Sequence, residues 1–332
     1  MPPTIRRILP SVLALLLLAG CSSQPYVWIE GFAQGSTYHT ICSLPGTVSQ
    51  KDAEAAIDSI LNAVDNSLSG YNKSSLLSRL NAGEDLPLDA IFIECFERSA
   101  EIWRESDGAF DPSAAPLFDL WGFGFEEQAG VSDAAVDSIL QFVGMDLLRL
   151  EKRSDGIHLV KEDPRVKLNF NAIAQGLSCD LIARRLQSLG AENYLVEVGR
   201  EIVCKGVSAR GDAWRIGIDK PFDGNMDEGK NLQGIVEVGD RGIVTSGNYR
   251  KFYVIDGEKF AHTIDPRTGR PVRHSLLSAT ILAQDAATAD AYATWMMVIG
   301  PEKAREVLHS REDLDAYLIC DVDGEMILQN SF

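Results

Sequence analysis

The chain has 332 residues, of which 45% are hydrophobic and 24% charged, so it can build one large core or two smaller ones and does not have the composition of a disordered, collagen-like or disulfide-scaffolded protein. Its formal net charge of -17 excludes nucleic acid as a favourable partner, because phosphates need Lys and Arg to neutralise them. A polyanionic substrate would need a metal ion or aimed backbone N–H groups beside it.

The N-terminus is typical of an export signal. A short basic segment with Arg6 and Arg7 precedes an apolar run over residues 8–18, which is too short to span a bilayer comfortably. The run leads into the sequence LAGC, which ends at Cys21 and resembles a bacterial lipobox, in which the cysteine is lipidated and becomes the mature N-terminus. An ordinary secretory signal with an incidental cysteine is the alternative.

This pattern predicts a signal peptide over residues 1–20, a lipidated Cys21 with a tether over residues 21–30, and a folded domain over 31–332. Several acyl chains on one cysteine would anchor the protein stably. We therefore expect it in the bacterial cell envelope, lipid-anchored to a membrane and facing the periplasm or the exterior. The sequence leaves open which membrane holds the anchor.

The other five cysteines are scattered along the chain without a CxxC spacing. An odd, unpatterned set argues against a zinc site and against a full disulfide framework. We expect these cysteines to be small buried residues, and the sequence leaves a single disulfide open.

Hydrophobic periodicity predicts helices and strands in separate runs. The predicted helices lie at about 53–64, 88–105, 175–189 and 285–299, and the predicted strands at 194–198, 214–218, 234–238, 252–255 and 278–283, with a closing hairpin of 316–320 and 325–328. Two segments rich in Gly and Pro, 110–124 and 261–272, are predicted loops. This order favours an α+β fold with antiparallel-rich sheets flanked by helices over a doubly wound parallel sheet.

Asp290 and Thr294 are four residues apart in the last long predicted helix, so they share a face. A carboxylate and a hydroxyl are hard oxygen donors, which suit Mg²⁺ together with phosphate oxygens and water. A solvated polar face is the alternative that spacing alone leaves open.

The segment NFNAIAQGLSCD, from Asn169 to Asp180, is a turn that enters a predicted helix. Its small residues would let a ligand approach the backbone, and free N–H groups at a helix start can hold phosphate. Neither of the nucleotide fingerprints GxxxxGK[ST] and GxGxxG is present. Tyr71 and Trp121, which lie beside glycines in predicted loops, could stack on a ligand ring or pack in a core.

His262 stands near the start of the predicted loop AHTIDPRTGRPV. Loops of this kind often carry binding groups on a rigid scaffold, and a histidine can transfer protons near neutral pH. A purely structural histidine is the alternative.

Several longer motifs occur in one order along most of the chain. They are GSTY (35–38), SGY and SRLN (69–71 and 78–81), FDP through LWGFG (110–124), NAIAQG (171–176), YLVEVG (194–199), TSGNYR (245–250), HTIDPRTG (262–269) and ADAYAT (289–294). Together they resemble the ApbE-type FAD:protein FMN transferases, a family of bacterial envelope lipoproteins. The resemblance extends from about residue 31 to residue 300.

The resemblance implies an ApbE-like, T-fold-like architecture and a catalytic domain over residues 31–332. It implies an enzyme that binds FAD with Mg²⁺, moves the FMN half onto a Thr or Ser hydroxyl of a partner protein as a phosphoester, and releases AMP. The implied partner is a flavin-carrying subunit of a membrane redox complex, recognised through a short Asp-Ser/Thr-Gly-Ala-Ser/Thr-like sequence. A metal-dependent FAD pyrophosphatase and a non-catalytic flavin-binding lipoprotein are the alternatives.

By motif position, the resemblance implies a metal held by Asp290, Thr294 and the backbone carbonyl of Ala172, with Ala293 beside them. It implies catalytic roles for Asp290 and for His262 near the reacting phosphate. The residues that it implies for dinucleotide binding are Gln34, Tyr71, Ala109, Phe110, Asp111, Asn169, Gln175, His262 and Ile264.

The chain departs from the usual family pattern at several positions. Gln34 stands where Met is usual, Asn169 where Asp is usual, and Gln175 where Lys or Glu is usual. Leu76 replaces an acid, and Arg200 replaces the second Gly of a Gly-Gly-Glu motif. The metal positions are intact, so these departures leave the inference of Mg²⁺ binding untouched.

Overall fold

The structure is a computed structural model, which describes residues 25–124, 131–222, 225, 229–248, 252–255, 258–323 and 325–330. The predicted signal peptide and Cys21 lie outside the described residues. Within the described part of the chain, no helix combines the length and the apolar character needed to cross a membrane.

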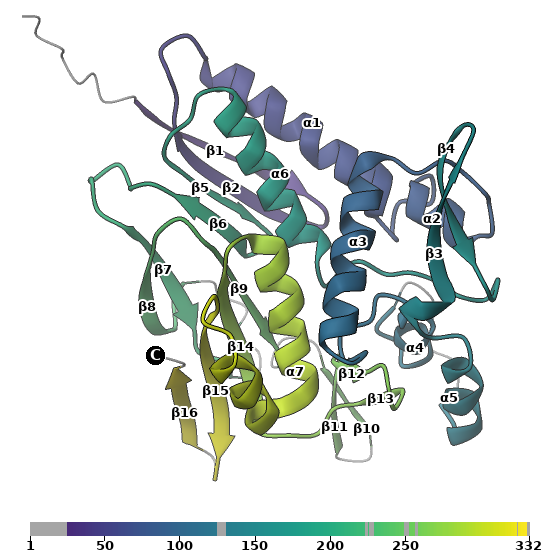
Figure 1. The fold of residues 1–332 in the computed structure, drawn as a ribbon. Helices are drawn as coiled ribbons and strands as arrows, with labels where there is room; N and C mark the ends of the chain where they lie inside the picture. The colour runs from purple at the N-terminus through teal and green to yellow at the C-terminus, as the bar shows by residue number, and fades with distance from the viewer. Residues whose placement is uncertain are drawn as a thin grey trace, which may run out of the picture.

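An eight-stranded sheet forms the centre of the molecule (Figure 1). Its strands, in sheet order, are β1 (Tyr26–Ala33), β2 (Ser36–Ser43), β5 (Tyr194–Val198), β6 (Glu201–Lys205), β9 (Gly242–Gly247), β14 (Leu276–Ala283), β15 (Asp315–Val322) and β16 (Glu325–Asn330). Every neighbouring pair is antiparallel. The predicted α+β class is therefore confirmed.

Three helices cover one face of this sheet: α1 (Gln50–Leu68), α6 (Ala174–Ser188) and α7 (Ala286–His309) (Figure 1). The apolar sides of α1 and α6 pack with β2 and β5 in one buried cluster. In α7 the helical geometry breaks at Gly300, whose φ is 79°. The break lies directly before Pro301, which cannot donate a backbone hydrogen bond, so the predicted helix end near residue 299 matches a real interruption.

A hairpin of β7 (Trp214–Asp219) and β8 (Leu232–Val238) packs on the opposite face. Trp214 is buried and donates its Nε1–H to the carbonyl of Lys205 at 2.9 Å. It shares a buried cluster with Ile243 of β9 and Ile319 of β15. The central strands therefore bury side chains on both faces.

A second group of elements lies beside the sheet, on the right of Figure 1. It contains α2 (Leu76–Asn81), α3 (Ala90–Glu105), α4 (Ala115–Leu120), α5 (Asp133–Leu140), a 3-10 helix (Met145–Leu147) and the hairpin of β3 (Leu148–Arg153) and β4 (Gly156–Lys161). The largest buried cluster joins this group to α7. Within that cluster, the rings of Phe92 and Phe170 meet edge to face with their centroids 5.5 Å apart.

Two short ladders complete the described elements. They are β10 (Phe252–Ile255) with β11 (Glu258–Ala261), and β12 (Ile264–Asp265) with β13 (Arg270–Pro271). The prediction of a loop over 261–272 is corrected here, because that segment contains β12 and β13. The turn between them closes where Gly269, with a φ of 67°, donates its N–H to the Asp265 carbonyl at 2.8 Å.

Two further predictions are corrected. β1 begins at Tyr26, so residues 26–30, predicted as part of the tether, belong to the sheet. The predicted loop over 110–124 contains α4, which has Pro116 in its first turn, where the missing N–H breaks no helical bond. The prediction of buried cysteines is confirmed by Cys42, Cys95, Cys179, Cys204 and Cys320, which are all buried and free.

Gly176 lies where α6 meets the start of α7. A β-carbon added there would lie 2.4 Å from the carbonyl oxygen of Ala286, so the two helices would have to move apart. We expect Gly176→Ala to lower the free energy of unfolding by about 1–3 kcal/mol through overpacking, although alanine favours helices more than glycine does. Urea unfolding followed by circular dichroism measures the change.

The control for this prediction is Gly46→Ala, because an added β-carbon at Gly46 meets nothing within 4 Å. If the two variants are equally stable, the contact between α6 and α7 is not as tight as the structure indicates.

Candidate functional site

The start of α6 and the first turns of α7 meet directly. The backbone N–H of Gly176 donates to Asp290 Oδ2 at 3.2 Å, across the contact that the missing side chain of Gly176 permits. This places Ala172, in the turn just before α6, on the same side of the molecule as the Asp290 carboxylate. The structure thus brings together two segments that are more than a hundred residues apart in sequence.

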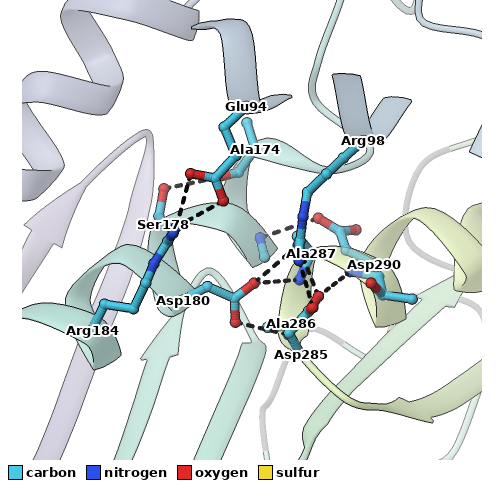
Figure 2. A network of polar contacts seen from close by, with 12 residues as sticks. Glu94, Arg98, Ala174, Ser178, Asp180, Arg184, Asp285, Ala286, Ala287 and Asp290 are labelled. Atoms are coloured by element: carbon cyan, nitrogen blue, oxygen red, sulfur yellow. Dashed lines mark hydrogen bonds and ion pairs between the residues drawn. The ribbon is translucent and has the colours of Figure 1, made fainter. Parts of the chain in front are cut away.

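A polar network fixes this junction (Figure 2). Asp180 of α6 accepts hydrogen bonds from the N–H groups of Ala286 and Ala287, both at 2.9 Å. Asp285 caps α7 by accepting from the N–H of Thr288 at 2.8 Å, and the guanidinium of Arg98 on α3 binds both oxygens of Asp285 at 2.9 and 2.6 Å. Three helices are therefore joined at the N-terminus of α7, where negative charge is favourable.

The two carboxylates of this network differ in their protonation behaviour. Burial, and then the charge of Asp285, raises the pKa of Asp180 to about 7. Burial opposes ionisation of Asp285 as well, but the Arg98 guanidinium overcomes it and lowers the pKa of Asp285 below its usual value. Arg98 also lies 3.7 Å from Asp180, so one cation serves both acids.

A second pair of carboxylates, Asp290 and Glu201, is not neutralised in this way. Burial raises the pKa of Asp290 to about 7, and burial followed by the charge of Asp290 raises the pKa of Glu201 well above its usual range. Glu201 Oε2 is buried and has no hydrogen-bond partner among the described residues. An uncompensated buried charge is costly, so these two groups fit a bound cation.

The hydroxyl predicted as a metal ligand lies close to this pair. Thr294 is one helical turn beyond Asp290, and its Oγ1 is 3.4 Å from the Oγ of Ser246 on β9. Ala293 lies in the core with its side chain fully buried. Among the described residues there is no group of three or more His, Cys, Asp or Glu side chains arranged for a metal, so a cation here would depend on hydroxyl, carbonyl, water and phosphate oxygens. That donor set suits Mg²⁺.

His262 lies just before the β12–β13 hairpin, and several contacts hold that hairpin in place. Thr263 Oγ1 donates to Asn248 Oδ1 at 2.6 Å, and Trp121 Nε1 donates to the carbonyl of Gly269 at 2.8 Å. The His262 ring meets the ring of Phe123 edge to face, with centroids 6.3 Å apart. Ile264 is buried in the small cluster beneath. The imidazole is thus partly exposed on a fixed support.

The polar residues in the middle of this hairpin pair with each other. Arg267 binds Asp265 through Nε at 2.9 Å and through its terminal nitrogen at 2.8 Å. The Asp265 carboxylate raises the pKa of Arg267 above its usual value. These charges therefore hold the turn in shape.

The predicted dinucleotide-binding residues at 109–111 lie mostly in the interior. Ala109 and Phe110 are 1% and 2% exposed, so only their main chains could meet a ligand. Asp111 accepts from Trp103 Nε1 at 3.0 Å and from the Ser113 N–H at 2.7 Å, and burial raises its pKa to about 6. This carboxylate already has internal partners, which shape the loop before α4.

The remaining predicted residues surround the start of α6. Tyr71 is 67% exposed and receives a long hydrogen bond of 3.5 Å from Asn171 Nδ2. Asn169 Oδ1 accepts from the Asn171 N–H at 2.8 Å, which folds the turn before the helix. Gln34, in the β1–β2 turn, donates to Ser178 Oγ at 2.8 Å. An exposed aromatic ring, a folded turn and a helix start therefore lie together.

Gln175 belongs to the same region. Its side chain fills the space beside Gly199, where an added β-carbon would lie 2.1 Å from Gln175 Nε2. The β5–β6 turn is thus packed against the first turn of α6.

Sequence reasoning missed three parts of this site. Ser246 was only one letter of a longer motif, and nothing in the sequence pairs it with Thr294. The network of Arg98, Asp180 and Asp285 has no local signal, because its members come from three distant helices. Glu201 is the acid of the Gly-Gly-Glu motif in which Arg200 replaces the second Gly, but the motif alone assigned it no role.

Comparison with known proteins identifies relatives that match most of the chain. The family model described as the ApbE family matches residues 35–318. The FAD:protein FMN transferase of Escherichia coli (strain K12) is 35% identical over 322 residues, which cover 92% of this chain and 90% of the relative. The FAD:protein FMN transferase of Vibrio cholerae is 35% identical over 315 residues, which cover 93% and 92%.

Solved structures show the same relationship. The flavin transferase ApbE from Vibrio cholerae superposes with a TM-score of 0.81 at 33% identity, covering 92% of this chain and 97% of that one. The apo form of the flavinyl transferase ApbE from Pseudomonas stutzeri gives a TM-score of 0.82 at 30% identity, with coverage of 93% and 95%. The shared fold, the matched family model and the near-complete coverage show that this chain belongs to the ApbE family.

Proposed function

We propose that this chain transfers FMN from FAD to a Thr or Ser hydroxyl of an acceptor protein, with Mg²⁺ as the required cation. The transfer itself is supported by its relatives, which are FAD:protein FMN transferases and flavin transferases. The structural observation that carries the metal dependence is the buried pair Asp290 and Glu201, in which one carboxylate oxygen has no hydrogen-bond partner in the part of the chain that the structure describes. A bound cation would offset the charge of two buried carboxylates that lie near each other.

Asp290, Thr294 and the carbonyl of Ala172 would hold the cation. When bound there, it would neutralise charge on the pyrophosphate and help to align the displacement. The chain itself, with a net charge of -17, offers little positive charge for this purpose. The turn before α6 adds backbone N–H groups that can approach a phosphate.

Other residues would orient the reactants and move the proton. His262 would accept the proton of the acceptor hydroxyl as its oxygen attacks the FMN phosphorus. A phosphoester bond forms, the P–O bond of the pyrophosphate bridge breaks, and AMP leaves. Tyr71, which is 67% exposed, offers a ring on which flavin or adenine can stack. The Arg98 network keeps the first turns of α7 in place for this reaction.

The proposed acceptor rests on the family resemblance, and the proposed location rests on the N-terminal sequence that ends at Cys21. The acceptor would be a flavin-carrying subunit of a membrane redox complex with an Asp-Ser/Thr-Gly-Ala-Ser/Thr-like sequence. Lipidation of Cys21 would anchor the enzyme to a membrane of the cell envelope, facing the periplasm or the exterior. Anchoring would raise the local concentration of enzyme near such a subunit.

The first test uses a chain that begins at Ser22, FAD, and an acceptor domain that carries this sequence. With Mg²⁺ we expect the acceptor to gain the mass of an FMN phosphoester, because the cation neutralises the pyrophosphate. With EDTA we expect no gain. Mass spectrometry of the acceptor, with measurement of AMP, records both results.

Two other results would contradict the proposal. Free FMN and AMP with an unmodified acceptor would make the protein an FAD pyrophosphatase. Unchanged FAD with Mg²⁺ present would make it a flavin-binding protein. An acceptor domain whose target Thr or Ser is replaced by Ala is the control for site specificity.

The second test concerns His262. We expect His262→Ala to slow FMN transfer by about 10²- to 10⁴-fold, the usual contribution of a general base, while FAD and metal still bind. Single-turnover transfer assays measure the rate. His309→Ala is the matched control, because His309 is exposed near the end of α7 and forms a local hydrogen bond with the carbonyl of Arg305. A His262→Ala variant with full activity would rule out the proton-accepting role.

A further inference from the structure

The side chain of Glu201 projects toward the helical face of the sheet. In the β5–β6 hairpin, Glu201 pairs with Val198, and Val198 is buried in the cluster beneath α1 and α6. Residues directly opposite each other on antiparallel strands point to the same face. Gly199 and Arg200, with φ of 65° and 91°, form the tight turn that sets this register.

The neighbours of this carboxylate belong to α6 and α7. The Cys179 thiol donates to the main-chain carbonyl of Glu201 at 3.0 Å, which holds the start of β6 against α6. Burial first, and then the charges of Glu201, Asp180 and Asp290, raise the pKa of the Cys179 thiol, so these acids lie near one another. Arg200 offsets part of the charge on Glu201, and Glu197 adds to it.

The Glu201 carboxylate is therefore buried, close to Asp290, and left with a free acceptor. Its Oε2 has no hydrogen-bond partner among the described residues. Buried polar groups are nearly always satisfied, and an exception beside a second carboxylate indicates a missing positive group. The neighbouring acids Asp180 and Asp285 differ from this pair in having a cation beside them, because Arg98 lies 3.7 Å from Asp180 and 2.6 Å from Asp285.

We propose that Glu201 is a second carboxylate of the cation site, and that its Oε2 binds the cation or one of the cation's waters opposite Asp290. This inference rests on the proposed metal dependence and adds a residue to it. Two carboxylates balance the charge of a divalent cation. With both carboxylates, the site can bind its cation before FAD binds. With one carboxylate, cation binding would depend on the phosphates of FAD.

The test measures cation binding without substrate. Mn²⁺, a paramagnetic substitute for Mg²⁺, is titrated into the purified full-length protein without FAD and followed by electron paramagnetic resonance. We expect Glu201→Gln to weaken Mn²⁺ binding by about 10- to 100-fold, the usual effect of removing a partner that supports a metal site. Added FAD should recover part of the loss, because its phosphates supply the missing charge.

Glu197→Gln is the matched control. Glu197 lies on the same hairpin but pairs with Ile202, which is buried on the opposite face of the sheet, and it lies 3.7 Å from His39. This variant loses the same charge a few residues away, so we expect unchanged Mn²⁺ affinity. Equal affinity of Glu201→Gln and wild type would overturn the inference, as would equal losses in both variants.

Thermal unfolding separates this role from a structural one. Removing an unpaired buried charge should raise the Tm of metal-free Glu201→Gln above that of metal-free wild type and reduce the increase in Tm that Mn²⁺ produces. A lower Tm in the metal-free variant would instead show that Glu201 supports the fold, and would overturn the inference.

The two proposals fail in different ways. If wild type binds Mn²⁺ and Glu201→Gln binds it equally well, the metal-dependent function stands and only the role of Glu201 is wrong. If wild type binds no Mn²⁺ with or without FAD, the metal dependence itself is wrong and the role of Glu201 falls with it.

Discussion

The contact between α6 and the first turn of α7 determines where the proposed ligands lie. Gly176 permits the approach, since any side chain there would meet the backbone of Ala286. Asp180 then accepts from two N–H groups at the start of α7. Because each helix is rigid, fixing these few atoms also fixes Asp290 and Thr294 farther along α7. Ala172, directly before α6, is placed by the same contact.

The carboxylates around this junction form two pairs, and the first pair has the Arg98 cation beside it. Arg98 lies 2.6 Å from Asp285 and 3.7 Å from Asp180, and each attraction at such distances amounts to about 4 kcal/mol at an effective dielectric constant of 20. Asp290 and Glu201 repel each other, and both have a raised pKa. The first pair stabilises the helix arrangement, while in the second pair Glu201 Oε2 has no hydrogen-bond partner among the described residues, which supports the proposed cation site. Asp180 and Asp285 therefore support the fold, whereas Asp290 and Glu201 have the proposed role of binding the cation.

The sequence predicted the elements whose information is local. The α3 and α6 helices, the β5 strand and the closing hairpin follow from periodicity, breakers and caps, and the spacing of Asp290 and Thr294 follows from the helical repeat. The β1 and β2 strands were missed, because most of β1 was predicted as tether and nothing was predicted for β2, and their burial depends on β5 and α1. Glu201 was missed because its environment is created by β6, α6 and α7 together, which no single stretch of sequence encodes. Asp111 shows the reverse, since its motif predicts a ligand contact while the fold provides its carboxylate with internal partners.

The order of strands in the central sheet also affects how the chain reaches its native state. β2 pairs with β5, and the hydrogen bond from Ser43 Oγ to the Asn193 carbonyl spans 150 residues. Until β5 is available, the edge of β2 that pairs with β5 in the native sheet stays unpaired. Trp28 and Phe32, which are exposed even in the native fold, add apolar surface to the hairpin. Proteins dominated by such non-local contacts fold slowly, and open strand edges can pair with other chains. The interval between formation of the first hairpin and docking of β5 is therefore the period when the open edge of β2 can pair with other chains.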